Sequence, residues 1–160
     1  METISWEVNS SKFSDSYVAG FLDGDGSIVA TVEHRPERRR FPYRVRLKIN
    51  FTQHIRHRDL LVKLQKFLGG LGSIRNVASH NLCELVIQDR KQVRRVLERL
   101  SPCIILKERQ AKIMLAIIRI YDGATVNVRS SLSEKEFQKI IRMVRQIRTL
   151  NSGTGGKKKI

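Results

Sequence analysis

The segment spanning residues 18–27 constrains the fold more than any other, because an apolar run of helical character ends abruptly in carboxylates set between glycines. A helix that begins at Ser14 or Asp15 would place Asp23 and Asp25 at its C-terminal end, where the helix dipole disfavours negative charge. A cation is therefore expected to compensate these carboxylates. A hard divalent ion bound by carboxylate and backbone carbonyl oxygens is the simplest choice, and the glycines let it approach the backbone closely.

Two known motifs share part of the spacing of these acidic residues and glycines, but neither matches the chain at every required position. A calcium-binding EF-hand loop requires glycine and glutamate where this chain has Ile28 and His34. A dinucleotide-binding fingerprint requires a preceding strand and a third glycine where Val29 stands. A helix stop followed by a tight acidic turn accounts for the glycines of the turn. It leaves Gly20 unexplained, because a helix-weakening residue inside an apolar run favours two helices packed backbone to backbone.

The net charge of the chain indicates that its partner is a polyanion. The 160 residues carry a formal charge of +16, with a sequence pI near 10.6, and such basic chains typically bind a polyanion. Nucleic acid is the leading candidate, and an anionic membrane surface is the second. The apolar runs are too short to span a bilayer and no secretion signal is evident, so we expect a soluble intracellular protein of the cytoplasm or an organelle matrix. Cys83 and Cys103 form no ligand-spaced pair, which argues against a zinc site or a disulfide framework.

Periodicity and breaking residues predict a helix, two strands, a helix, two strands and then further helices. Strands are expected at residues 27–33, 44–51, 73–77 and 82–87, with a charged loop at 34–40. Helices are expected from residue 14 or 15 to the acidic pair, over 58–68, from 89 to 100, over about 107–121, and from 133 up to a flexible basic tail at 151–160.

Local signals mark several helix boundaries. Asp89 with Gln92 and Ser133 with Glu136 each match a capping box, which opens a helix. The pair at residues 122–123, aspartate followed by glycine, is expected to end the helix before it.

The strand at 44–51 has two chemically different faces. Its apolar residues alternate with a polar row made of Arg44, Arg46, Lys48 and Asn50. Like charges side by side on an open sheet face repel one another, and a phosphate backbone relieves that repulsion. Arginine and lysine can bond guanine and asparagine can bond adenine, so this face could read bases in a major groove. A solvated face with ordinary surface charges is the alternative, and the strict alternation, beside Arg35 and Arg75, favours DNA.

Residues 17–27 resemble the signature of the LAGLIDADG homing endonucleases, in the branch that carries one motif per chain. The resemblance implies an α+β fold of order αββαββα, with a four-stranded antiparallel sheet that forms a saddle on DNA, followed by C-terminal helices. The resemblance covers residues 14–121, and the length of the chain indicates a single such domain, expected at residues 1–150. The resemblance also implies a homodimer, because the family packs two motif helices at a two-fold axis and this chain is too short for two copies of the unit.

The same resemblance assigns roles to individual residues. The last acidic residue of the motif, Asp25, is implied to bind a catalytic divalent ion, with the Gly24 carbonyl as a further ligand. Mg²⁺ is the expected ion and Mn²⁺ is an alternative. Gln53 matches a polar residue that orients water beside the metal, and Lys107 matches a basic residue that stabilises charge on the phosphate.

The saddle implied by the family assigns DNA contacts to the open face of the sheet. The expected DNA-contacting residues are Ser27, Thr31, Glu33, Arg35, Arg44, Arg46, Lys48, Asn50 and Arg75. Arg58, or His57 beside it, is expected to have a peripheral role in the active site.

These features predict a site-specific homing endonuclease whose homodimer makes a metal-dependent double-strand break in a long, pseudo-palindromic DNA target. Neither a small-molecule substrate nor a membrane partner is expected. Two alternatives use the same scaffold: an RNA-binding intron maturase, and a DNA-binding protein that has lost catalysis. The presence of Asp23 and Asp25 together with Gln53 and Lys107 favours the active nuclease.

Overall fold

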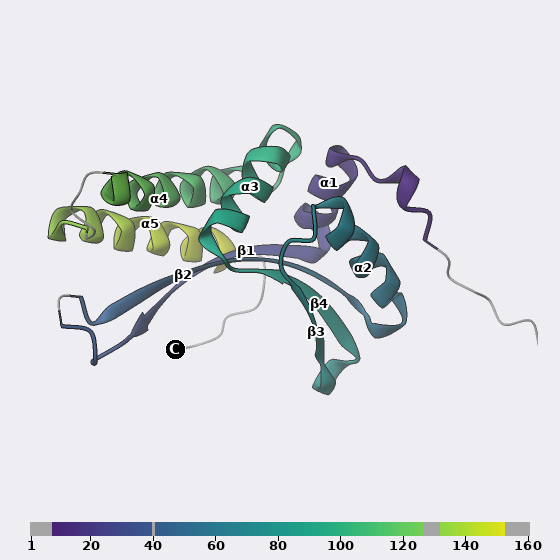
Figure 1. The fold of residues 1–160 in the computed structure, drawn as a ribbon, viewed down its shortest axis with the longest axis horizontal. Helices are drawn as coiled ribbons and strands as arrows, with labels where there is room; N and C mark the ends of the chain where they lie inside the picture. The colour runs from purple at the N-terminus through teal and green to yellow at the C-terminus, as the bar shows by residue number, and fades with distance from the viewer. Residues whose placement is uncertain (1–7, 40, 127–131, 153–160) are drawn as a thin grey trace, which may run out of the picture.

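The computed structural model describes residues 8–39, 41–126 and 132–152. Its helices and strands follow one another in the predicted order (Figure 1). Their bounds are α1 Asp15–Asp25, β1 Gly26–His34, β2 Tyr43–His54, α2 Arg58–Phe67, β3 Ser73–Val77, β4 Leu82–Ile87, α3 Arg90–Leu100, α4 Glu108–Val126 and α5 Glu134–Ser152. The α+β architecture of order αββαββα, followed by C-terminal helices, is therefore confirmed.

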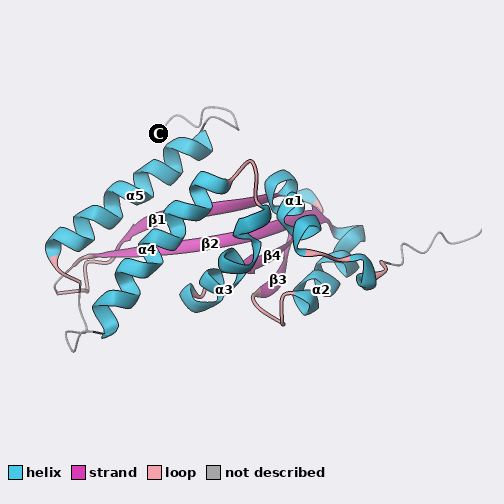
Figure 2. Cartoon of the chain, turned by 90° about the horizontal axis from the view of Figure 1, so that it is seen from above, coloured by secondary structure: helices cyan, strands magenta, loops and turns pink. Residues whose placement is uncertain are grey.

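The four strands form one antiparallel sheet in the order β1-β2-β4-β3. β1 pairs with β2 along its whole length, from Gly26 opposite Phe51 to His34 opposite Tyr43. β4 pairs only with the second half of β2, beginning at Ile49. The sheet is curved, and the described helices cover one of its faces while the other face stays open (Figures 1 and 2).

The core lies between the sheet and the helices. The strands contribute buried apolar residues at every second position, namely Ile28, Ala30, Leu47, Ile49, Phe51, Leu85 and Ile87. Helix residues of the same cluster include Val18, Ala19, Leu22, Met114, Ile117, Ile140, Val144 and Ile147. Each large aliphatic side chain contributes about 1.5–3 kcal/mol when fully buried, so the alternation read from the sequence places the sheet with its apolar face toward the helices.

Predicted helix starts are confirmed by their side-chain hydrogen bonds. At the start of α1, Ser14 Oγ accepts a bond from the backbone N–H of Tyr17 at 3.1 Å. Asp89 caps α3 in the same way. Before α5, the Ser133 N–H donates to Glu136 Oε2 at 2.8 Å, and the Glu136 N–H donates to Ser133 Oγ at 3.1 Å. These bonds satisfy backbone donors that a helix leaves unpaired at its N-terminus.

Helix α4 does not end at the predicted place. It passes through Asp122 and Gly123 and continues to Val126, so the expectation that this pair stops the helix is wrong. Asp122 Oδ2 instead accepts a hydrogen bond from Arg94 of α3 at 2.8 Å. A glycine inside a helix costs only about 1 kcal/mol, which the packing of α4 against the core outweighs.

Helix α5 also extends further than expected, because it runs to Ser152 and includes Asn151 of the predicted tail. Asn151 Nδ2 donates to the carbonyl oxygen of Ile28 in β1 at 2.9 Å, and its Oδ1 accepts from Gln110 of α4 at 3.3 Å. These contacts across the fold hold the last turn of the helix. The remaining residues of that tail, 153–160, lie outside the described residues.

Both cysteines lie within the described residues. Cys83 is buried and Cys103 is partly buried, and both are free thiols. None of the helices in the described ranges combines the length and the apolar character needed to cross a membrane.

Candidate active site and DNA-facing surface

A hydrogen bond between two predicted catalytic residues, Asp25 and Gln53, joins the end of α1 to the end of β2. Asp25, the last residue of α1, is exposed, and its Oδ2 accepts a hydrogen bond from Gln53 Nε2 at 3.2 Å. Gly26 allows the helix to pass directly into β1 at this place. A Cβ on Gly26 would lie 2.8 Å from both the Asn50 carbonyl oxygen and Leu22 Cδ1, which is closer than real side chains approach.

Asp23 lies in the same turn of helix but has different partners. Its carboxylate accepts backbone N–H bonds from Ile105 at 2.9 Å, Leu106 at 3.0 Å and Lys107 at 3.0 Å. Burial opposes ionisation of Asp23, but the three amide donors and the Lys107 charge outweigh it, so the pKa of Asp23 lies below its ordinary value. Asp23 is thus compensated by the backbone just before α4 together with the charge of Lys107, and a divalent ion remains a prediction for Asp25.

Lys107 also contacts Asp23 through its side chain. Its ammonium donates to the carbonyl oxygen of Asp23. Burial lowers the pKa of Lys107, and the negative charges of Asp23 and Asp25 partly oppose that shift. Three residues predicted to be catalytic, Asp25, Gln53 and Lys107, therefore gather at one place, although they come from α1, β2 and the segment before α4.

The peripheral candidates His57 and Arg58 lie at the start of α2. Arg58 is close enough to the Cys83 thiol of β4 for its charge to oppose the burial that raises the pKa of that thiol. This placement puts Arg58 beside the start of β4, and no described contact joins it to Asp25.

The donor chemistry at Asp25 fits a hard divalent ion. Asp25 offers an exposed carboxylate, and the neighbouring Gly24 is exposed and carries no side chain. Within the described ranges, no group of three or more His, Cys, Asp or Glu side chains could hold a metal. An ion at Asp25 would therefore find only part of its coordination shell among the described residues, and phosphate, water or a second chain would supply the rest.

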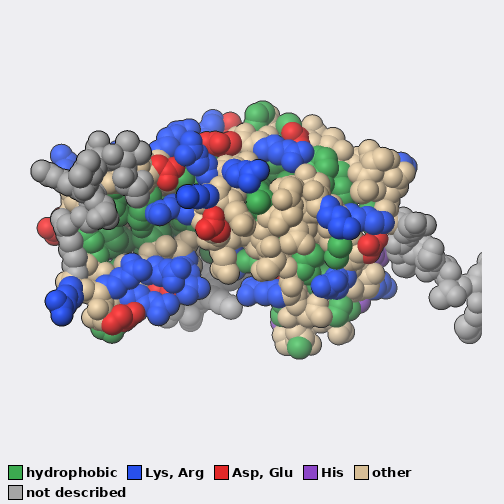
Figure 3. All heavy atoms as spheres, in the orientation of Figure 1, with side chains coloured by type: hydrophobic (Ala, Val, Ile, Leu, Met, Phe, Trp, Pro, Cys, Tyr) green, Lys and Arg blue, Asp and Glu red, His purple; other side chains and the backbone are tan. Residues whose placement is uncertain are grey.

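The predicted DNA-contacting residues of β1 and β2 lie on the open face of the sheet. In the register of the two strands, Ser27 is opposite Asn50, Thr31 is opposite Arg46 and Glu33 is opposite Arg44. Alternation places Lys48 on the same face, and Arg75 of β3 pairs with Glu84 of β4 there. Lys and Arg side chains dominate the charged surface in the view of Figure 3, over both the sheet and the helices.

Acidic residues organise these basic side chains. Glu33 Oε1 lies 2.8 Å from Arg46 Nε, and Glu33 Oε2 lies 3.2 Å from Arg35. Glu84 holds Arg75 at 2.8 Å in the same way. Sequence reasoning missed Glu84, although the alternation of the strand at 82–87 would have placed it on this face. The arginines are therefore oriented before any ligand arrives.

Asn50 differs from the free adenine-reading amide that was expected. It is only 8% exposed, its Oδ1 accepts a hydrogen bond from Ser27, and its Nδ2 donates to Glu84 at 3.3 Å. Both ends of the amide are thus engaged inside the protein, because β2 lies between β1, which carries Ser27, and β4, which carries Glu84. A base contact by Asn50 requires one of these bonds to be exchanged.

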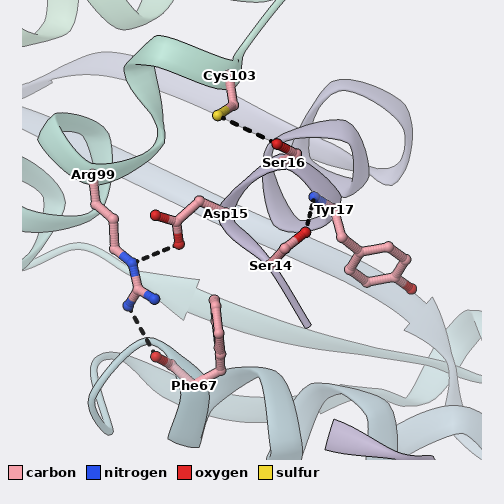
Figure 4. Close-up of polar contacts among 7 residues, drawn as sticks. All are labelled: Ser14, Asp15, Ser16, Tyr17, Phe67, Arg99 and Cys103. Carbon is pink, nitrogen blue, oxygen red and sulfur yellow. Dashed lines mark hydrogen bonds and ion pairs between the residues drawn. The ribbon is translucent and has the colours of Figure 1, made fainter. Parts of the chain in front are cut away.

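Polar contacts fix the first turns of α1 to neighbouring helices (Figure 4). Asp15 Oδ1 accepts a bond from Arg99 Nε at 2.8 Å, and Arg99 also donates to the Phe67 carbonyl oxygen at 3.0 Å. Ser16 Oγ contacts Cys103 Sγ at 3.6 Å. These contacts connect α1 to the end of α2 and to α3 with the turn that follows it.

The side of α1 that carries Tyr17, Gly20 and Gly24 is exposed. Together with the nearby Ile105 and Leu106 we call it the α1 surface. Gly20 and Gly24 are exposed, and an added Cβ on either would meet no atom within 4 Å. Tyr17 is 46% exposed, and the nearby Ile105 and Leu106 are 85% and 66% exposed. Large exposed apolar side chains beside bare glycines are typical of a surface that another chain covers.

A family model and two related proteins indicate the same family for this chain. The family model for LAGLIDADG endonuclease matches residues 18–113. DNA endonuclease I-CreI of Chlamydomonas reinhardtii is 31% identical over 135 residues, which cover 84% of this chain and 77% of that protein. DNA endonuclease I-CvuI of Chlorella vulgaris is 33% identical over 104 residues, which cover 65% of this chain and 63% of that protein.

Solved structures share the fold. A crystal structure of I-CvuI in complex with its target aligns with a TM-score of 0.77 at 26% identity, over 91% of this chain and 85% of that chain. The archaeal intron-encoded homing endonuclease I-Vdi141I, complexed with DNA, aligns with a TM-score of 0.73 at 18% identity, over 94% of this chain and 91% of that chain. With its motif, its sheet topology and these relatives, the chain belongs to the LAGLIDADG family of homing endonucleases, in the branch that carries one motif per chain.

Proposed function

We propose that this chain is a site-specific homing endonuclease whose homodimer cuts both strands of a long, pseudo-palindromic DNA duplex with the help of divalent metal ions. The observation that carries the proposal is the cluster of Asp25, Gln53 and Lys107 beside an open sheet face lined with oriented arginines. Such a face supplies DNA contacts and the cluster supplies chemistry. We place the enzyme inside the cell, where its DNA substrate is found.

The residues of the cluster divide the work of phosphodiester hydrolysis. When bound, a divalent ion such as Mg²⁺ would lower the pKa of a water molecule and neutralise charge on the phosphate. Asp25 and the Gly24 carbonyl would hold that ion, Gln53 would orient the attacking water, and Lys107 would stabilise charge on the phosphate. Crystal structures of I-CvuI with DNA were obtained in the presence of Mg and of Ca, which supports a divalent ion for the family.

A homodimer follows from the chemistry and from the α1 surface. One chain offers one motif carboxylate at Asp25, whereas a double-strand break requires chemistry on two strands. Gly20 and Gly24 would let two copies of α1 approach closely, and Ile105 with Leu106 would become buried between the subunits. The same contact would bring the two Asp25 carboxylates near one another at the base of the helix pair.

The test uses plasmid DNA that carries the joined sequence flanking the coding region, because an endonuclease of this type should cut the site where its own element is absent. With Mg²⁺ we expect conversion of supercoiled plasmid to the linear form, and with EDTA no conversion. Mn²⁺ in place of Mg²⁺ should also support cutting. Binding without any cutting in either ion would instead favour a maturase or an inactive DNA-binding protein, and undiminished cutting in EDTA would exclude metal dependence.

A further inference from the structure

A second group of basic side chains lines a groove between α4 and α5. The two helices lie side by side over the sheet (Figure 2). The groove has a volume of about 560 Å³ and is lined by Arg109, Lys112, Ile113, Arg142, Arg145, Gln146, Thr149 and Leu150. We call it the α4–α5 groove. Four of these residues are cationic and none is acidic.

The cations of the α4–α5 groove are poorly neutralised by the protein. Lys112 lies 2.7 Å from Glu108, one turn earlier in α4. Arg109, Arg142 and Arg145 take part in none of the ion pairs found among the described residues. Like charges one helical turn apart repel each other, so this arrangement favours an anionic ligand that spans both helices.

DNA on the sheet does not account for this groove. α4 and α5 place Met114, Ile117, Ile140 and Val144 in the core toward the sheet, and the groove arginines lie on exposed turns of the same helices. The sheet and its core therefore separate the groove from the open face that carries Arg44 and Arg46. Duplex bound to that face leaves the groove charge in place.

The shape of the groove selects among polyanions. The volume of about 560 Å³ is that of a small-ligand cleft, so the groove can hold a short stretch of one strand but cannot enclose a duplex. Ile113, Leu150 and the aliphatic stems of the cationic side chains supply the apolar part of the lining, and the four positive charges favour a polyanion over the apolar face of a partner helix. Gln146 and Thr149 add groups that hydrogen-bond a sugar or a base edge.

We infer that the α4–α5 groove binds the backbone of a single-stranded nucleic acid, at a site separate from the DNA-cleavage surface. Arg109 and Lys112 on one wall and Arg142 and Arg145 on the other contact phosphates, while the sugars lie against Ile113 and Leu150. Binding at this groove does not depend on the endonuclease activity, so the two can succeed or fail separately.

The test measures fluorescence anisotropy of labelled 15-nucleotide oligo(U) and oligo(dT) with the full chain in EDTA, while unlabelled target duplex saturates the sheet. We expect the oligonucleotide to bind the chain that already holds duplex. The double variant Arg142→Glu/Arg145→Glu should weaken this binding by about tenfold or more, and loss of two phosphate contacts should reduce the salt slope by about 1.4. Stronger binding of oligo(U) than of oligo(dT) would assign the groove to RNA. Equal binding would show that the groove accepts both single-stranded RNA and single-stranded DNA.

The matched control carries the same charge change on α3, at the exposed residues Lys91 and Arg95. Lys91→Glu/Arg95→Glu should change oligonucleotide affinity by less than about threefold. Equal weakening in both double variants, or displacement of the oligonucleotide by the target duplex, would overturn the proposal. If the groove variant melts at a lower temperature than the unmodified chain, Arg142→Gln/Arg145→Gln replaces it, and no loss of affinity in that variant would also overturn the proposal.

Discussion

The carboxylate of Asp23 accepts a hydrogen bond from the backbone N–H of Lys107 at 3.0 Å, and the Lys107 ammonium returns to the carbonyl oxygen of Asp23. The pair thus locks the end of the motif helix to the start of α4. Because Gly24 and Asp25 follow Asp23 directly, the same lock sets where the candidate metal ligands lie relative to the lysine. Asp23 is therefore expected to position the residues of the candidate active site.

Replacing Asp23 with alanine should remove the acceptor for three backbone amides. By analogy with the loss of a helix cap, we expect the free energy of unfolding to fall by about 1–2 kcal/mol at pH 7, and cleavage to slow because Lys107 loses its position. Chemical denaturation and single-turnover cleavage measure the two effects. The control Asp59→Ala removes an ion pair with the partly buried Lys63 and should cost less than about 1 kcal/mol.

The effect of Asp23 on stability should also depend on pH. Since folding lowers the pKa of Asp23, its contribution is fully present above the unfolded value of about 3.9 and is lost as pH falls through the lower folded value. The gap in unfolding free energy between the unmodified chain and Asp23→Ala should therefore stay constant near neutrality and shrink below about pH 4. A gap that grows on acidification would contradict the lowered pKa.

Changing Asp25 to asparagine should separate binding from chemistry. The amide keeps the size of the side chain but is a poor ligand for a hard cation, so we expect duplex affinity in EDTA to stay within a few-fold while cleavage with Mg²⁺ falls by ~10³-fold. Gel shift and plasmid linearisation measure these quantities. Asp59→Asn is the charge-matched control and should cut normally. A rate close to normal for Asp25→Asn would remove this residue from the chemistry.

Arg46 tests whether the open sheet face reads bases. Glu33 holds its guanidinium at 2.8 Å, so the side chain is oriented before DNA binds. Arg46→Ala should relax preference at one symmetric pair of positions in the target by about 1–3 kcal/mol. Affinities for a set of singly substituted targets provide the measurement, with Arg119→Ala on the exposed side of α4 as the control. A uniform loss on every target would mean that Arg46 contacts phosphate.

Gly20 tests the homodimer. Because a Cβ at Gly20 meets no atom of its own chain within 4 Å, Gly20→Leu should fold and should gain about 0.5–1 kcal/mol of helix stability as a monomer. In a dimer packed through the α1 surface, the added side chain separates the helices. We expect sedimentation to show monomers and double-strand cleavage to disappear. Gly123→Leu, also in a helix with open space around it, should leave association unchanged, and a Gly20→Leu dimer would exclude this interface.

Local periodicity predicted most of the elements, because burial at every second or every third to fourth residue is set by the backbone geometry of strands and helices. The strand at 44–51 follows this rule and is confirmed. The helix start at Ser133, which was predicted from its capping box, is confirmed as well. The ends of α4 and α5 do not. Arg94 of α3 and Ile28 of β1 provide partners for residues near those ends, and contacts with distant elements leave no mark in the local pattern.

The candidate site shows the same division. The amino-acid sequence alone determined the acidic end of the first helix, the glycines around it and the polar face of β2, since each depends on residue type and spacing within a short segment. Only the tertiary structure decided that Asp23 is compensated by backbone amides more than eighty residues away, that Asn50 is engaged on both sides, and that two helices form a basic groove. These properties arise where separate segments meet, so their free energies belong to the packed fold and not to any one stretch of chain.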